Sequence, residues 1–112
     1  MSSDYTTVIS HYRIKAGTLE PFLDLVGRHW PVLRELELAT DTPPRYFVDD
    51  HEAGTPPLVI EVFEWASDAA VQRAHTHPDV STMWEKMGEF FADDGVTSPR
   101  EHFSVRPVDV AN

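Results

Sequence analysis

The stretch Leu58-Val-Ile-Glu-Val-Phe-Glu-Trp65 decides the fold that we predict from this sequence. It is rich in β-branched and aromatic side chains and follows a loop that holds two consecutive prolines, a pattern typical of a β-strand. Alternate side chains of a strand lie on opposite faces. The apolar sets are Val59, Phe63 and Trp65 on one face and Leu58, Ile60 and Val62 on the other. Because both faces are apolar, both are expected to be covered.

Outward from this strand, the pattern of the chain predicts the order β-α-β-β-α-β. Segments rich in β-branched and aromatic residues indicate strands, and segments with an apolar residue every three or four positions indicate helices. Pro31 falls inside the first helical segment and should kink or split it near Arg28, because proline cannot donate a helical hydrogen bond. Strands are predicted at 6–14, 45–50, 58–65 and 101–108, helices at 19–38, 67–75 and from 78 onward, and a loop at 93–99.

This order predicts an α+β, ferredoxin-like domain, in which helices cover one face of a four-stranded antiparallel sheet. The whole chain, 1–112, is predicted to be a single domain with its core at about 6–108. One chain's helices can cover only one face of the strand at 58–65. The sheet of a second subunit is the simplest cover for the other face, so we expect a homodimeric α/β barrel. A loop or tail over that face is the alternative.

Composition excludes several classes of partner. The formal net charge of −10 disfavours a nucleic-acid partner, because such a surface repels phosphate backbones. No apolar stretch is long enough to span a membrane, and the first residues do not resemble a secretory signal. The chain has no cysteine, which excludes disulfides and thiolate metal sites. We therefore expect a cytoplasmic protein.

The layout resembles the antibiotic-biosynthesis-monooxygenase family of dimeric α/β barrels over about residues 7–108. The resemblance is carried by the element order, by Val62-Phe63-Glu64-Trp65 closing a strand, and by a histidine-bearing helix after Ser67. It implies a substrate pocket between sheet and helices. It also implies, as in some members, oxidation of phenolic or anthrone-like polyketides by dioxygen without a cofactor. Heme-degrading members ligate iron through a histidine of the second helix, a region where Trp84 or a neighbour lies here, so we expect no cofactor.

Glu61 is the first candidate for catalysis. The resemblance aligns Trp65 with a pocket tryptophan, but it places Glu61 where such oxygenases have an asparagine. A carboxyl group among apolar neighbours loses hydration and gains affinity for a proton, as a general base requires. Glu61 could thus remove a phenolic proton, or one next to a carbonyl group. The alternative is a structural carboxylate that is paired with an arginine or a histidine. Glu64, on the opposite face, is expected at the dimer interface.

His29 and His75 are the other catalytic candidates, because each lies on the apolar side of its predicted helix. Either could orient or protonate a substrate oxygen, although a structural histidine in the core is more common than a catalytic one. His75-Thr-His77 resembles a metal-binding pair only if both side chains share a face, and Pro78 places His77 at a helix entry instead. A metal site that adds Glu61 and His102 is conceivable, but we predict none, and we assign His102 no role.

Aromatic side chains could form the walls of a pocket for a flat ligand by stacking. The alternative is that they only fill the core, which fits Trp84 best because it lies on a regular helical stripe. Since Tyr12 and His11 face opposite ways, at most one of them can line the pocket. The candidates for substrate binding are Trp65, Phe63, Trp30, Trp84 and Phe22.

The leading hypothesis from sequence is a homodimeric, cofactor-independent monooxygenase-like enzyme for a small aromatic or polyketide-like molecule. Glu61 would act as base, with His75 or His29 orienting the substrate and Trp65 stacking on it. Two alternatives share the same scaffold. One is a non-catalytic small-molecule-binding or stress-associated barrel, and the other is an isomerase or cyclase.

Overall fold

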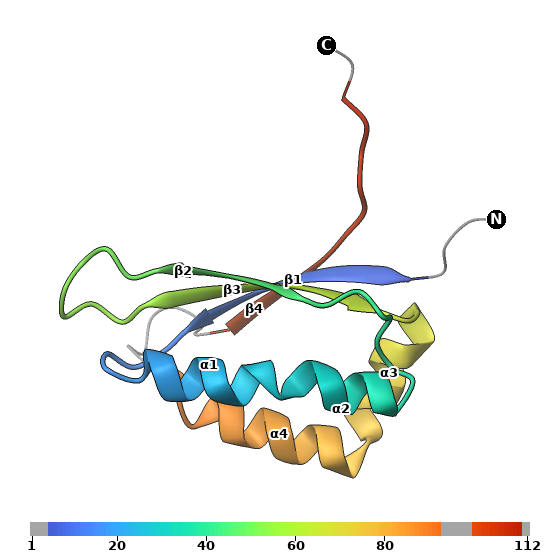
Figure 1. Cartoon of the computed structure of the whole chain (residues 1–112), viewed down its shortest axis with the longest axis horizontal. Helices are drawn as coiled ribbons and strands as arrows, with labels where there is room; N and C mark the ends of the chain where they lie inside the picture. Colours follow the sequence, from blue (N-terminus) through green and yellow to red (C-terminus); the bar gives the residue numbers. More distant parts are fainter. Residues whose placement is uncertain (1–4, 93–99, 111–112) are drawn as a thin grey trace.

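The computed structural model describes residues 5–92 and 100–110, in which four strands and four helices follow the predicted order β-α-β-β-α-β, with two helices in each helical segment. The strands form one antiparallel sheet in the order β2-β3-β1-β4, and the helices lie on one side of it (Figure 1). The α+β, ferredoxin-like fold is therefore confirmed. The strands are β1 (Thr6–Arg13), β2 (Arg45–Asp49), β3 (Leu58–Trp65) and β4 (Arg100–Val105), and the helices are α1 (Leu19–Gly27), α2 (His29–Glu35), α3 (Asp68–Thr76) and α4 (Pro78–Gly88).

The first helical segment is split, as Pro31 predicts. Helix α1 ends at Gly27 and α2 begins at His29, with Arg28 between them. An unbroken helix would need a hydrogen bond from the backbone nitrogen of Pro31 to the carbonyl of Gly27, and proline has no hydrogen there. The split places Pro31 in the first turn of α2, where that hydrogen is not needed. It also places His29 at the start of a new helix, facing the sheet.

The last strand is shorter than predicted. It ends at Val105 rather than at residue 108, because Val105 pairs with Thr7 and β1 itself begins only one residue earlier, at Thr6. Residues 106–110 then run away from the sheet (Figure 1). The predicted loop at 93–99 lies outside the described residues. No described helix is long and apolar enough to cross a membrane.

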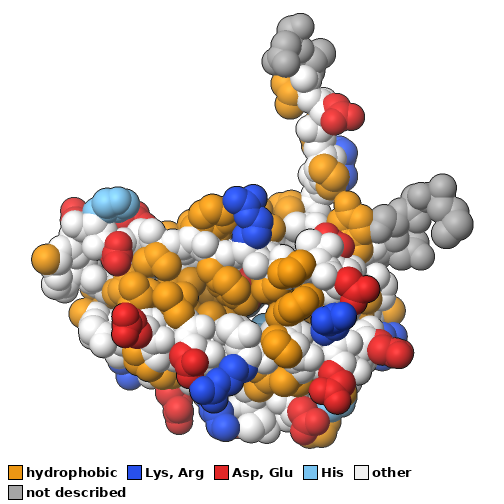
Figure 2. All heavy atoms as spheres, viewed as in Figure 1, with side chains coloured by type: hydrophobic (Ala, Val, Ile, Leu, Met, Phe, Trp, Pro, Cys, Tyr) orange, Lys and Arg blue, Asp and Glu red, His pale blue; other side chains and the backbone are white. Residues whose placement is uncertain are grey.

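The two faces of the sheet differ in what covers them. The face toward the helices carries the core, with Val59 and Phe63 of the central strand β3 at most 1% exposed. On the opposite face, Phe47 and Phe103 remain 45% and 44% exposed. Figure 2 shows further hydrophobic side chains gathered in a band between the sheet and the helices, with charged side chains around it.

The start of α3 offers a test of the local structure. The Ser67 hydroxyl oxygen accepts a hydrogen bond from the backbone N–H of Ala70 (3.0 Å), which caps the helix. Replacing Ser67 with Ala should lower the free energy of unfolding by ~1 kcal/mol, measured by urea denaturation. Ser81→Ala, inside α4, is the matched control and should leave stability unchanged or slightly higher. Equal stability of Ser67→Ala and the native chain would contradict the cap.

Candidate functional site

A row of polar side chains crosses the helix-facing side of the sheet. Tyr46 of β2 is opposite Glu61 of β3, Glu61 is opposite Ser10 of β1, and Ser10 is opposite His102 of β4. Ser10 and Glu61 are 3% and 2% exposed, so this row lies inside an otherwise apolar layer. Buried polar groups need partners, and the partners available here define the site.

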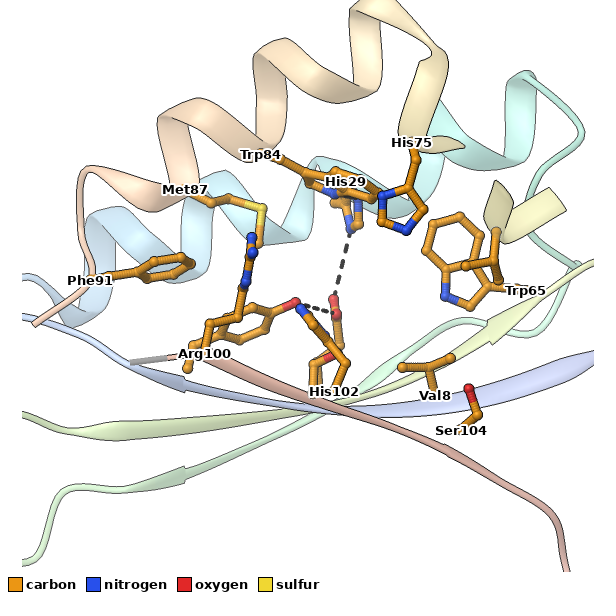
Figure 3. Close-up of a pocket in the computed structure, with 14 residues that line it drawn as sticks. Val8, His29, Trp65, His75, Trp84, Met87, Phe91, Arg100, His102 and Ser104 are labelled. Atoms are coloured by element: carbon orange, nitrogen blue, oxygen red, sulfur yellow. Dashed lines mark hydrogen bonds and ion pairs between the residues drawn. The ribbon is translucent and has the colours of Figure 1, made fainter. Parts of the chain in front are cut away.

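A cavity of about 230 Å³ lies between this row and the helices. Its walls come from strands β1, β3 and β4 and from helices α2, α3 and α4 (Figure 3). The sheet contributes Ser10, Tyr12, Glu61 and His102, and the helices contribute His29, His75 and Trp84. The site is therefore mixed, with an acid, three imidazoles and aromatic rings around one space.

Glu61 has one engaged oxygen and one without a partner. The hydroxyl of Tyr12 donates to Oε1 at 3.1 Å, whereas Oε2 has no hydrogen-bond partner among the described residues. Burial, and then the nearby Glu61, raise the pKa of Tyr12 well above its usual 10.0. The same two causes raise the pKa of Tyr46, whose hydroxyl donates to the carbonyl of Val26 (3.2 Å). Both phenols therefore stay protonated and serve as donors.

His29 faces the unpartnered oxygen of Glu61. Its Nδ1 lies 4.0 Å from Oε2, too far for a hydrogen bond, and it also has no partner among the described residues. Its Nε2 accepts a hydrogen bond from the indole N–H of Trp84 (2.9 Å). An indole nitrogen can only donate, so Nε2 must present its lone pair, and the ring proton must be on Nδ1. The pocket thus holds a donor and an acceptor without hydrogen bonds, joined only by the 4.0 Å contact that is dashed from His29 in Figure 3.

His102 is a pocket residue that the sequence did not reveal. Its Nδ1 lies 2.7 Å from the hydroxyl oxygen of Ser10, on the helix-facing side of β4. Burial, and then the charge of Arg100, lower the pKa of His102 below its usual 6.5. The only available signal was the pairing of β4 with β1, which the sequence does not specify. The same pairing brings Arg100 and Ser104 to the cavity.

Five of the predicted site residues line the cavity. Glu61 and His29 are buried, and Trp65 and Trp84 form aromatic walls with ring centroids 6.5 Å apart. His75 is exposed at the end of α3, with its ring 5.1 Å from that of Trp84, so it lies at the pocket edge rather than in the core. Of the pair on β1, Tyr12 lines the cavity, whereas His11 packs against Phe103 on the other face.

Three predicted substrate-binding residues lie outside the lining. Phe63 is 1% exposed and supports the rings of His29 and Trp65. Trp30 is turned away from His29 by one helical step, and its indole N–H donates to the carbonyl of Thr40 (3.2 Å). Phe22 belongs to a second core cluster. Helical periodicity for Trp30 and Phe22, and strand alternation for Phe63, predict a buried side but do not show which ring borders the cavity.

His77 caps α4, because its Nδ1 accepts a hydrogen bond from the backbone N–H of Asp79 (3.2 Å). This is the helix-entry position predicted from Pro78. Within residues 5–92 and 100–110, no group of three histidine, aspartate or glutamate side chains is placed to hold a metal ion.

Comparison with solved structures identifies the fold. No protein-family model matches the chain, and no curated protein does. An antibiotic biosynthesis monooxygenase superposes with a TM-score of 0.67 at 17% identity, over 93% of this chain and 99% of the other. The chain has the fold of these monooxygenases. The resemblance seen in the sequence is therefore confirmed for the fold.

Two further structures show the range of proteins with this fold. SnoaB, a cofactor-independent oxygenase from Streptomyces nogalater solved as a mutant, superposes with a TM-score of 0.62 at 14% identity, over 96% of both chains. A NIPSNAP family protein from Agrobacterium tumefaciens superposes with a TM-score of 0.66 at 16% identity, over 99% of this chain and 92% of the other. The activity of the present chain must therefore be argued from its own site.

The lowered pKa of His102 predicts how stability depends on pH. The unfolded chain binds a proton at His102 near pH 6.5, whereas the folded chain resists it. The contribution of this residue is therefore present above pH 6.5 and is lost as the pH falls toward the folded-state pKa. Urea denaturation between pH 8 and pH 5 should show a smaller loss of stability for His102→Gln than for the native chain. Parallel curves would contradict the prediction.

Proposed function

We propose that this protein is a cofactor-independent oxygenase for a small aromatic molecule, with Glu61 as the general base. The observation that carries the proposal is the unpartnered Oε2 of a carboxyl group that is 2% exposed and borders a cavity. A purely structural carboxylate would be expected to have both oxygens satisfied. The fold shared with monooxygenases, one of them described as a cofactor-independent oxygenase, favours oxygenation over other proton-transfer reactions.

The chemistry needs only a base and dioxygen. Glu61 takes an acidic proton from the substrate, either phenolic or next to a carbonyl group, and leaves an electron-rich anion. This anion gives one electron to dioxygen, and the two radicals join through a new carbon–oxygen bond. The peroxide takes the proton back from Glu61. The hydroperoxide then loses water, which includes the hydrogen atom of the carbon that bears the new oxygen, and a carbonyl group is left at that carbon. One oxygen atom thus enters the product and the other leaves as water.

The other pocket residues have supporting roles in this proposal. The hydrogen bond from the Tyr12 hydroxyl to Oε1 keeps the carboxyl group oriented while Oε2 accepts the substrate proton. Trp65 and Trp84 provide aromatic walls against which a flat ring can stack. His75, at the pocket edge, is placed to orient the outer part of the ligand. The cavity of about 230 Å³ is below the ~300–1,000 Å³ of typical ligand pockets, which favours a compact ligand of one or two rings over a large polyketide.

Replacing Glu61 with Gln should reduce turnover by ~10²–10⁴-fold, because the amide cannot accept the substrate proton. The measurement is oxygen uptake with a panel of hydroquinones, naphthols and anthrones. Glu85→Gln, at an exposed position of α4, removes the same charge and should leave turnover unchanged. Uptake that persists in Glu61→Gln would refute the base assignment. No uptake by the native protein over the whole panel would favour a binding protein or an isomerase on the same scaffold.

The open face of the sheet supports a second part of the proposal, a homodimer. Phe47 and Phe103 are exposed there, and Ile60 and Val62 of β3 are only partly covered. An apolar sheet face of this kind is unfavourable in water. A second copy of the chain offers a surface of the same shape and chemistry, which two-fold symmetry can bring into contact.

A charge on this face should separate the subunits. Ile60→Glu and Phe47→Glu should each sediment with the mass of one chain, whereas the native protein should sediment with the mass of two. Gln72→Glu, at an exposed position of α3, adds the same charge and should remain a dimer. A native protein that sediments as a single chain would overturn the dimer but not the pocket.

A further inference from the structure

We infer that the ligand of this pocket presents a hydroxyl group to His29 and Glu61, and that Trp84 is the positioning residue that selects it. The inference rests on the proposed function in taking the cavity as the substrate site. It goes beyond that function by naming the reacting group, since a base alone would serve a C–H acid equally well.

Two buried polar atoms beside the cavity have no hydrogen-bond partner among the described residues. Within the described residues, the only buried side-chain nitrogen or oxygen atoms without a hydrogen bond are Nδ1 of His29 and Oε2 of Glu61. Both residues are 2% exposed, both line the cavity, and the two atoms are 4.0 Å apart. Leaving such atoms unpaired is unfavourable, so a group that pairs with both of them gains affinity from two contacts at once.

The neighbours of His29 and Glu61 determine which of the two unpartnered atoms donates and which accepts. Trp84 donates its indole hydrogen to Nε2 of His29, which leaves the ring hydrogen on Nδ1. Nδ1 is therefore a donor. Oε1 of Glu61 already accepts from Tyr12, and in the carboxylate form that the proposed base requires, Oε2 is a second acceptor. The ligand group between them must accept from one side and donate to the other.

Few chemical groups can accept one hydrogen bond and donate another through the same atom. A hydroxyl oxygen accepts and donates simultaneously, whereas a carbonyl or ether oxygen only accepts, and a C–H group does neither strongly. An oxygen at ordinary hydrogen-bond distances of ~2.7–2.9 Å from both atoms would sit beside the 4.0 Å line that joins them, with an angle of ~90° at that oxygen. A hydroxyl group can meet that angle. The predicted ligand class is therefore a small hydroxyarene.

Binding without turnover tests the inference separately from oxygenation. Under anaerobic conditions, calorimetric titration should show that 2-naphthol binds at least ~10-fold more tightly than 2-methoxynaphthalene, which keeps the oxygen but loses the donor hydrogen. Glu61→Met removes the acceptor and should abolish this preference. Trp84→Phe releases Nε2 and should weaken it, while Glu85→Gln should preserve it. Equal affinity of the native protein for the two probes would overturn the inference, because His29 and Glu61 would then pair with each other or with water.

A second measurement needs no substitution of the acid. The ring nitrogens of His29 should have ¹⁵N chemical shifts of a protonated Nδ1 and an unprotonated Nε2 in the native protein, and Trp84→Phe should shift this tautomer balance. The reverse pattern in the native protein would overturn the inference. Tight binding of 2-naphthol with no oxygen uptake would support the hydroxyl assignment while refuting the oxygenase. Turnover of anthrones, together with equal affinity for the two naphthalene probes, would support the oxygenase while refuting the hydroxyl assignment.

Discussion

The structure depends on how a carboxyl group is kept inside an apolar layer. Glu61 lies on the central strand β3 with 2% exposure, where an ionised group without partners would be strongly unfavourable. Strand β1 supplies a hydrogen-bond donor, the hydroxyl of Tyr12, and helix α2 places His29 close to the carboxyl group. Oε2 nevertheless has no hydrogen-bond partner among the described residues. The ligand proposed for the cavity would supply one.

The fold could be predicted from the sequence because its signals are local. The alternation of β3 is visible in eight residues, and the position of Pro31 is enough to place the break between α1 and α2. The capping residues Ser67 and His77 likewise lie next to the helices that they begin. The end of β4 could not be predicted, since it is set by where β1 begins to offer partners rather than by residues 106–108 themselves.

The site was predictable only in part, because most of it depends on contacts between distant segments. Glu61 was found because it interrupts an apolar strand, and His29 because it shares the buried side of its helix. Ser10 and His102 were missed because their place beside Glu61 follows from strand register, which pairs residues 92 positions apart. The hydrogen bond from Trp84 to His29 joins residues 55 positions apart, and the helical stripe favoured core packing for Trp84 and gave no sign of this bond.

The two faces of β3 separate the proposed pocket from the proposed dimer contact. Residues 59, 61, 63 and 65 face the helices, and of these Glu61 and Trp65 line the pocket, whereas Ile60 and Val62 face away and belong to the proposed contact with a second chain. Because alternation assigns neighbouring residues to opposite faces, a substitution on one face leaves the side chains of the other in place. The proposed dimer contact and the proposed chemistry could therefore vary independently on a single strand. The same alternation explains why a shift of one residue in register would be so damaging, since it would turn Glu61 to the outer face and turn Glu64 toward the helices.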